Sequence, residues 1–163
     1  KKAVSKPIFD CSDREIIILE DGFEADLEKL KRILKEDAMV YLQEFIASER
    51  YRNIRAFVVN GKVLGAIYQD VPLGQSIVDP NKSGLATICP LNRELVEIAT
   101  NAAKAMGTVY CNIDLLETAH GLSVTEMNGI PNGKEFFEVL GVNVTEAIAK
   151  HVHQYCYLRR VAV

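Results

Sequence analysis

Residues 112–128 read NIDLLETAHGLSVTEMN and predict two strands joined by a short turn. A hairpin centred on the histidine places Asp114 directly opposite Glu126. The same register pairs Asn112 with Asn128. Directly opposed side chains have Cβ atoms about 5 Å apart, and like charges at that separation destabilise the pair. Glu126 and Asn128 lie two residues apart, so they share one face of their strand.

Two carboxylates and the amide oxygen of Asn128 thus converge on one face, which in this register also carries Leu122 and Val124. A divalent cation would relieve the repulsion between Asp114 and Glu126, and carboxylate and amide oxygens suit Mg²⁺. The residues alone leave a second interpretation open, an exposed hairpin end with solvated acids. The metal interpretation depends on the register, because a shift of one residue moves every side chain to the opposite face.

Outside this stretch, apolar periodicity predicts further strands and helices. Asn60 and Gly61 supply the two positive-φ positions of a type I′ turn and predict a second hairpin. Asn92 and Asn143 are candidate helix N-caps. Hairpins outnumber parallel crossovers, which favours an α+β fold. The predicted elements are strands 3–8 and 16–19, helix 23–34, strand 40–46, hairpin 56–67, a loop 69–90 with one short strand, helix 92–107, strands 109–115 and 122–127, and a last helix from 143.

The composition is that of an ordinary globular protein, with 48% apolar and 25% charged residues. A net charge of −3 with scattered Lys and Arg gives no reason to expect a nucleic-acid partner. No apolar run approaches transmembrane length, so no membrane partner is expected. Four cysteines without paired spacing favour reduced thiols in the cytoplasm. The 163 residues suffice for one domain or two small lobes, and the connector 47–51 is the candidate boundary.

Five short motifs follow one another along the chain. They are VSKP with Lys6, Gln43-Glu44-Phe45-Ile46, Asn53-Ile54-Arg55, Ile113-Asp114-Leu115-Leu116, and Glu126-Met127-Asn128 through Pro131. In this order they resemble the ATP-grasp superfamily and, within it, the RimK-like glutamate ligases. The resemblance covers nearly the whole chain and implies an ATP-grasp fold without its N-terminal domain. Residues 1–46 would be the remainder of the nucleotide lobe, and residues 47–163 the C-terminal lobe with the metal site.

The resemblance also implies how the chain would bind ATP. Lys6 would place its ammonium on the phosphates, and Arg55, the candidate catalytic residue, would reach a terminal phosphate oxygen. The alternatives are an ordinary strand-end lysine and a solvated strand arginine. The adenine would be held through backbone groups and apolar contacts by Gln43, Glu44, Phe45 and Ile46, which also read as a buried strand.

For the metal site, the resemblance implies that Asp114, Glu126 and Asn128 bind one or two Mg²⁺ ions, or Mn²⁺, at the β and γ phosphates. The implied reaction transfers the γ-phosphate to a carboxylate. An amine, that of glutamate or a similar amino acid, then displaces phosphate from the acylphosphate to form an amide. The expected partners are a nucleotide and small-molecule acid and amine substrates, and a homo-oligomer is left open. The rival interpretation is a degenerate, non-catalytic nucleotide-binding or assembly module.

Two stretches depart from the family pattern. Residues 9–15, FDCSDRE, stand where relatives carry a glycine-rich loop, and their acids oppose phosphate binding. Residues 76–86, SIVDPNKSGLA, lack the arginine that relatives often carry, unless Lys82 substitutes. The intact metal ligands favour ligase ancestry, whereas the altered loop argues against routine turnover. The opening residues read as a strand already under way, so a fragment of a longer protein is expected.

Overall fold

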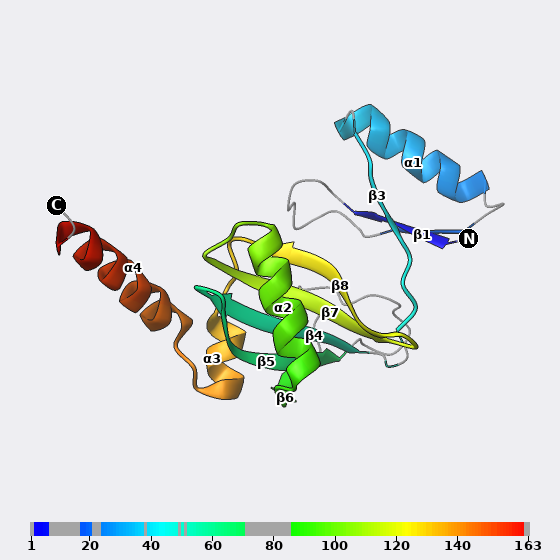
Figure 1. The fold of residues 1–163 in the computed structure, drawn as a ribbon. Coiled ribbons are helices and arrows are strands. Elements are labelled where there is room, and N and C mark those ends of the chain that lie inside the picture. Colours follow the sequence, from blue (N-terminus) through cyan, green and yellow to red (C-terminus); the bar gives the residue numbers. More distant parts are fainter. Residues whose placement is uncertain are drawn as a thin grey trace. The chain divides into compact units, whose positions relative to one another are not determined.

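The protein is described here by a computed structural model, which places residues 2–6, 17–20, 24–37, 39–48, 50, 52–70 and 86–161. It divides into two compact units, Lys1–Ala47 and Ser48–Val163. Figure 1 shows the helices and strands of each unit.

The first unit holds a three-stranded antiparallel sheet and one helix. Its order is β2-β1-β3, with β1 in the centre. Phe45 continues this pairing beyond the last strand, because its N–H donates to the carbonyl of Lys2 at 3.2 Å. The predicted strands and helix are confirmed with shifted ends. The elements are β1 (Lys2–Lys6), β2 (Ile17–Glu20), α1 (Glu24–Asp37) and β3 (Tyr41–Glu44).

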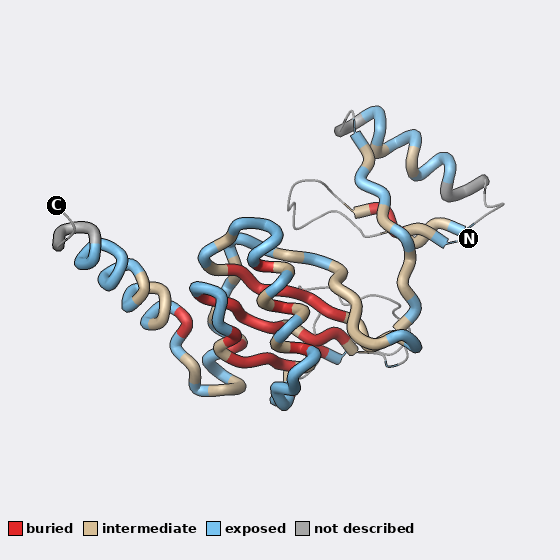
Figure 2. The backbone as a smooth tube through the Cα atoms, in the orientation of Figure 1, coloured by how far each residue is buried: buried red, intermediate tan, exposed pale blue. Residues whose placement is uncertain are grey.

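The second unit is built on a five-stranded antiparallel sheet in the order β6-β5-β4-β7-β8. Figure 2 shows that buried residues concentrate on its central strands. The strands are β4 (Arg52–Val59), β5 (Lys62–Asp70), β6 (Ala86–Cys89), β7 (Tyr110–Thr118) and β8 (Gly121–Asn128). The helices are α2 (Arg93–Ala105), α3 (Lys134–Leu140) and α4 (Val144–Val161).

Local signals in this unit act as predicted. Asn60 and Gly61 have φ angles of 49° and 69°, the positive values that a type I′ turn requires. The Asn92 side chain accepts a hydrogen bond from the Leu95 N–H at 2.8 Å and caps α2. Asn143 caps α4 in the same way. These turns and caps depend on neighbours in the sequence, which explains why they could be predicted.

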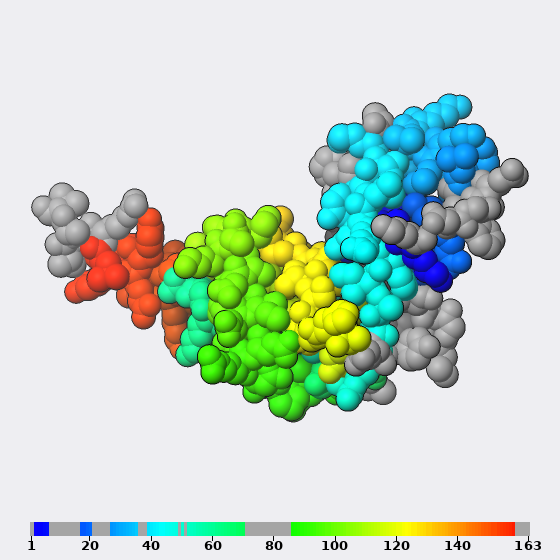
Figure 3. Space-filling model, turned by 45° about the vertical axis from the view of Figure 1, so that its right-hand side comes forward, coloured from blue at the N-terminus to red at the C-terminus, as the bar shows by residue number. Residues whose placement is uncertain are grey.

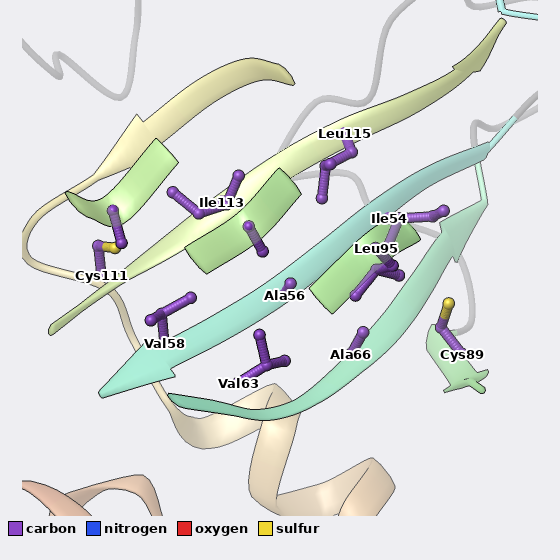
Figure 4. Close-up of a cluster of buried hydrophobic side chains, with 12 residues drawn as sticks. Ile54, Ala56, Val58, Val63, Ala66, Cys89, Leu95, Cys111, Ile113 and Leu115 are labelled. Atoms are coloured by element: carbon purple, nitrogen blue, oxygen red, sulfur yellow. The ribbon is translucent and has the colours of Figure 1, made fainter. Parts of the chain in front are cut away.

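The larger hydrophobic cluster lies between one face of this sheet and α2 (Figure 4). Ile54 and Ala56 point toward this helix from β4. Ile113 and Leu115 do so from β7, and Leu95 meets them from α2. α2 and β8 lie side by side on the surface of the unit (Figure 3). Because successive side chains of a strand point to opposite faces, the residues between these on β4 and β7 lie on the face away from α2.

A second, smaller cluster covers part of that opposite face, where α3 packs. Phe136 of α3 packs against Phe57 of β4, with ring centroids 5.6 Å apart. Gly65 of β5 permits this approach, since a Cβ there would lie 2.8 Å from Leu140 and 3.0 Å from Phe136. Helix α3 was not predicted from the sequence, because this seven-residue helix has no side-chain hydrogen bond at its N-cap, Gly133.

The distal part of α4 extends beyond this packing. Val144, at its start, is buried in the smaller cluster, whereas residues 152–158 are exposed. No helix among the described residues is long and apolar enough to span a membrane.

Candidate active site

The predicted pairing at the candidate metal site is confirmed. Asp114 of β7 lies opposite Glu126 of β8, and Asn112 lies opposite Asn128. Because Ile113 packs toward α2, its neighbours Asn112 and Asp114 lie on the opposite face of the sheet. The two acids and two amides therefore occupy adjacent positions on one face of a two-stranded ladder.

The rest of the predicted register is wrong by one residue. Thr118 pairs with Gly121, so the turn consists of two residues rather than being centred on His120. The ladder shifts between Asp114 and Leu115, where β8 contributes Thr125 as an extra residue. The different turn and the bulge cancel, so the predicted pairing of the acids survives.

The bulge also corrects the predicted surroundings of the acids. Leu122 and Val124 pack against the cluster under α2 and do not share the face of Glu126. Regular alternation would have placed all three on one face, but the extra residue reverses the alternation between Val124 and Glu126. The Thr125 hydroxyl donates to the Asp114 carbonyl at 3.2 Å. Glu126 thus lies on the opposite face from Leu122 and Val124, the apolar residues that precede it on β8.

Arg55 joins the acids from β4, where it lies in register with Asp114. Its guanidinium donates two hydrogen bonds of 2.8 Å, one to each Asp114 carboxylate oxygen. Burial by itself lowers the pKa of Arg55. The hydrogen bonds and charge of Asp114, with the charges of Glu135 and Glu126, outweigh this effect and leave the pKa raised. A fixed cation therefore lies within a group of acids on this face.

Three amides on the same face have buried oxygens without a hydrogen-bond partner. They are Oδ1 of Asn53, Oε1 of Gln69 and Oδ1 of Asn112. Asn53 pairs with Gln69 across β4 and β5, and the Gln69 amide donates to Glu135 at 2.7 Å. Gln69 and Glu135 are not among the site residues predicted from the sequence. A polar residue within the apolar strand β5 was the signal for Gln69, whereas Glu135 lies on the helix that was missed.

These side chains fit a hard divalent cation. Asp114 and Glu126 supply negative charge, and Asn128 and Asn112 supply amide oxygens of the kind that bind Mg²⁺. The Asn112 oxygen has no hydrogen-bond partner, so it is an acceptor available to a cation. Among the described residues, no three His, Cys, Asp or Glu side chains are placed to hold a metal, so the amides would be needed to complete the set. Asn128 also accepts a hydrogen bond from the Ile130 N–H at 2.8 Å.

The other predicted residues lie in the first unit. Lys6 ends β1 and pairs with Tyr41. Gln43 and Glu44 belong to β3, and Phe45 and Ile46 follow it. Residues 9–15 and most of 76–86 fall outside the described part of the chain. The structure thus brings Arg55 together with Asp114, Glu126 and Asn128 within the second unit, and it pairs residues 43–45 with β1 within the first.

A hollow of about 230 Å³ lies on the α2 side of the sheet, away from these acids. Its lining includes Tyr68, Cys89 and Glu117. Arg52 donates to both Glu117 carboxylate oxygens, at 2.8 and 3.2 Å, and stacks 3.6 Å from the Tyr68 ring centroid. None of the predicted site residues lines this hollow.

A scan against protein families matches residues 14–152 to the RimK-like ATP-grasp domain. The chain is 36% identical over 180 aligned positions to tetrahydromethanopterin:alpha-L-glutamate ligase of Methanosarcina acetivorans, covering 92% of this chain and 54% of the relative. The relative of the same name from Methanocaldococcus jannaschii is 32% identical, with 95% and 54% covered. The chain therefore spans about half the length of these curated relatives.

Solved structures provide a second comparison. ATP-grasp ligase PsnB, complexed with a variant of its minimal precursor, Mg and ADP, matches with a TM-score of 0.67 and 20% identity, over 94% of this chain and 46% of that one. D-alanine–D-alanine ligase from Bacillus anthracis matches with a TM-score of 0.62 and 18% identity, over 80% and 44%. This likeness shows a partial ATP-grasp fold, as the motifs predicted.

Proposed function

Because the chain belongs to the RimK-like ATP-grasp family, we propose that it is the metal-holding part of an ATP-dependent carboxylate–amine ligase. The observation that carries this proposal is the row formed by Arg55, Asp114 and Glu126 across β4, β7 and β8. This row puts one fixed cation beside two opposed carboxylates. A site for a nucleoside triphosphate and its metal uses a cationic side chain for the phosphates and acidic side chains for the metal.

The residues of this row would have separate roles. Arg55 would place its planar guanidinium on a terminal phosphate oxygen, to which it can donate two hydrogen bonds. Asp114, Glu126 and Asn128 would hold one or two Mg²⁺ ions, or Mn²⁺. The bound metal would neutralise negative charge on the phosphates. Each oxygen of the Asp114 carboxylate accepts one hydrogen bond from Arg55, which leaves a further lone pair on each oxygen for a cation.

The proposed reaction requires no nucleophile from the protein. A substrate carboxylate oxygen attacks the γ-phosphorus of ATP, and ADP leaves. The amine nitrogen then attacks the acyl carbon of the resulting acylphosphate, phosphate leaves, and the nitrogen loses a proton as the amide forms. Positioning and charge neutralisation are the main sources of rate in such transfers.

The first unit would supply the remaining nucleotide contacts. We assign Lys6 to the phosphates and residues 43–46 to the adenine, which makes 1–46 part of the nucleotide lobe and 47–163 the metal-bearing lobe. The support for these roles is the order of the family motifs along the chain. The hydrogen bond from Phe45 to Lys2 holds the proposed adenine segment beside β1.

We propose glutamate or a similar amino acid as the amine. The relatives from Methanosarcina acetivorans and Methanocaldococcus jannaschii are named tetrahydromethanopterin:alpha-L-glutamate ligase, and one from Stenotrophomonas maltophilia is named probable alpha-L-glutamate ligase. The acid would be a second small molecule.

The rival is a nucleotide-binding module without turnover, which the acidic residues 9–15 favour because they replace a glycine-rich loop. Release of ADP and phosphate by the full-length protein with glutamate and a panel of acids separates the two. Product release above the rate with ATP alone supports the ligase. ATP binding without release across the panel would refute it.

The metal site has a separate test. Asp114→Asn with Glu126→Gln should abolish Mg²⁺-dependent nucleotide binding in calorimetry, while the far-UV circular dichroism stays unchanged. Glu97→Gln with Glu138→Gln is the matched control, because it removes the same charge from two exposed positions. Unchanged affinity in the first double variant would exclude this trio as the site.

A further inference from the structure

The ladder of β7 and β8 brings together four oxygen-bearing side chains. Asp114 and Glu126 face each other in one register pair, and Asn112 and Asn128 face each other in the pair two residues away. Opposed residues are about 5 Å apart across an antiparallel ladder, and residues two apart along a strand are separated by about 7 Å. The four side chains therefore stand at the corners of a small rectangle, and the family motifs account for three corners.

Asn112, the fourth corner, is deeply buried. It is 3% exposed, and its Oδ1 has no hydrogen-bond partner. Leaving a buried acceptor unsatisfied costs about 1–3 kcal/mol. A position between Phe57 and Asn128 in register would hold an apolar side chain at lower cost, since Phe57 belongs to the hydrophobic cluster under α3. A structural role therefore does not explain the amide.

We propose that Asn112 is a fourth oxygen ligand of the divalent cation held by Asp114, Glu126 and Asn128. This inference rests on the proposed function, because it assumes that the trio binds a metal. An amide carbonyl oxygen suits a hard cation and adds no charge to a site that already contains two carboxylates. A bound cation would satisfy the Asn112 oxygen, which has no hydrogen-bond partner in the protein.

Asn53 provides a matched comparison within the same face. It is also buried, at 6% exposure, and its Oδ1 also lacks a partner. It lies on β4, opposite Gln69 on β5, and so outside the rectangle formed by β7 and β8. If burial of any unpaired amide on this face supported metal binding, Asn53 and Asn112 would behave alike. The proposal requires that they differ.

The test is Mn²⁺ binding to the whole chain, measured as the loss of the EPR signal of the free ion. Asn112→Leu should weaken Mn²⁺ binding at least about tenfold. Asn53→Leu should stay within about twofold of the wild type, a difference too small to count as a lost ligand. Asn112→Asp keeps an oxygen at this corner and should bind Mn²⁺ at least as tightly as the wild type.

Thermal unfolding supplies a second measurement. Asn112→Leu should not lower the Tm of the metal-free protein, because it removes an unsatisfied buried acceptor. It should reduce the rise in Tm that Mn²⁺ produces in the wild type. A merely structural asparagine would lower the metal-free Tm instead. If the leucine variant fails to fold, Asn112→Ala allows the same comparison.

The outcomes separate the inference from the proposed function. If Asp114→Asn with Glu126→Gln still binds Mn²⁺ like the wild type, the proposed metal site is wrong. If that double variant loses Mn²⁺ but Asn112→Leu binds normally, the trio stands and the fourth ligand is refuted. Equal weakening by Asn53→Leu and Asn112→Leu would also overturn the inference.

Discussion

The guanidinium of Arg55 on β4 holds the carboxylate of Asp114 on β7 through two hydrogen bonds of 2.8 Å. The two side chains are only 21% and 10% exposed, so water screens the pair weakly. Arg55, the residue proposed to bind phosphate, is thus hydrogen-bonded to Asp114, a residue proposed to bind the metal. A cation would compete with Arg55 for Asp114, and a nucleotide phosphate would compete with Asp114 for Arg55. The binding of the cation and that of the nucleotide would therefore be coupled.

Removing Arg55 should make metal binding easier when no nucleotide is present. Arg55→Gln is expected to tighten Mn²⁺ binding about threefold to tenfold, because a neighbouring positive charge and two charged hydrogen bonds are lost. Arg52→Gln is the matched control, since Arg52 pairs with Glu117 by a similar two-bond contact. Mn²⁺ titrations monitored by EPR give both affinities. Weaker binding in Arg55→Gln would contradict competition for Asp114.

The same pair should contribute measurably to stability. A double-mutant cycle of Arg55→Gln and Asp114→Asn should give a coupling free energy of about 1–3 kcal/mol in urea unfolding. Replacing one partner leaves the charge of the other buried without its counter-charge. The double variant should therefore be less destabilised than the sum of the two single variants. Additive single effects would show that the two groups do not stabilise one another in solution.

The Arg52–Glu117 pair predicts a pH dependence. Hydrogen bonds from Arg52 lower the pKa of Glu117 from its ordinary 4.5; partial burial opposes this, and the charges of Arg52 and Arg50 lower it further. A carboxylate with a lowered folded pKa stabilises the protein above its unfolded pKa, and this stabilisation is lost as the pH falls through the folded pKa. Glu117→Gln should therefore be less stable than the wild type at neutral pH, and the difference should shrink below about pH 4.5.

Urea unfolding of both proteins across that pH range measures the difference. Glu97→Gln, on the exposed side of α2, should show little effect at any pH. A difference between wild type and Glu117→Gln that grows on acidification would be opposite in sign to the expected effect.

The bulge at Thr125 predicts that deletion of Thr125 is tolerated and that deletion of Ser123 is not. Removing Thr125 leaves Val124 opposite Leu115 and Glu126 opposite Asp114 in a regular ladder. Removing Ser123 and closing the ladder in the same way would turn Val124 away from the apolar cluster. The Thr125 deletion should therefore keep Mn²⁺ binding with a modest fall in Tm. The Ser123 deletion should lose much more stability, and equal Tm values would contradict this account.

Much of the fold could be predicted because its signals are local. The positive-φ turn at Asn60 and Gly61, the cap at Asn92 and the opposition of Asp114 and Glu126 each depend on residues close in the sequence. The acids were placed correctly although the turn was placed wrongly, because the bulge restored the register. Helix α3 could not be predicted, since seven residues without a side-chain cap carry too little periodicity.

The sequence by itself determined the strands, the main turns and caps, and which acids of β7 and β8 oppose each other. The tertiary structure alone decided that Arg55 holds Asp114, that Gly65 receives α3, and that the Asn112 oxygen is buried without a partner. The physical reason is the range of the interactions. Backbone alternation and turn chemistry act between near neighbours, whereas ion pairing and burial depend on strands that are brought together from distant parts of the chain.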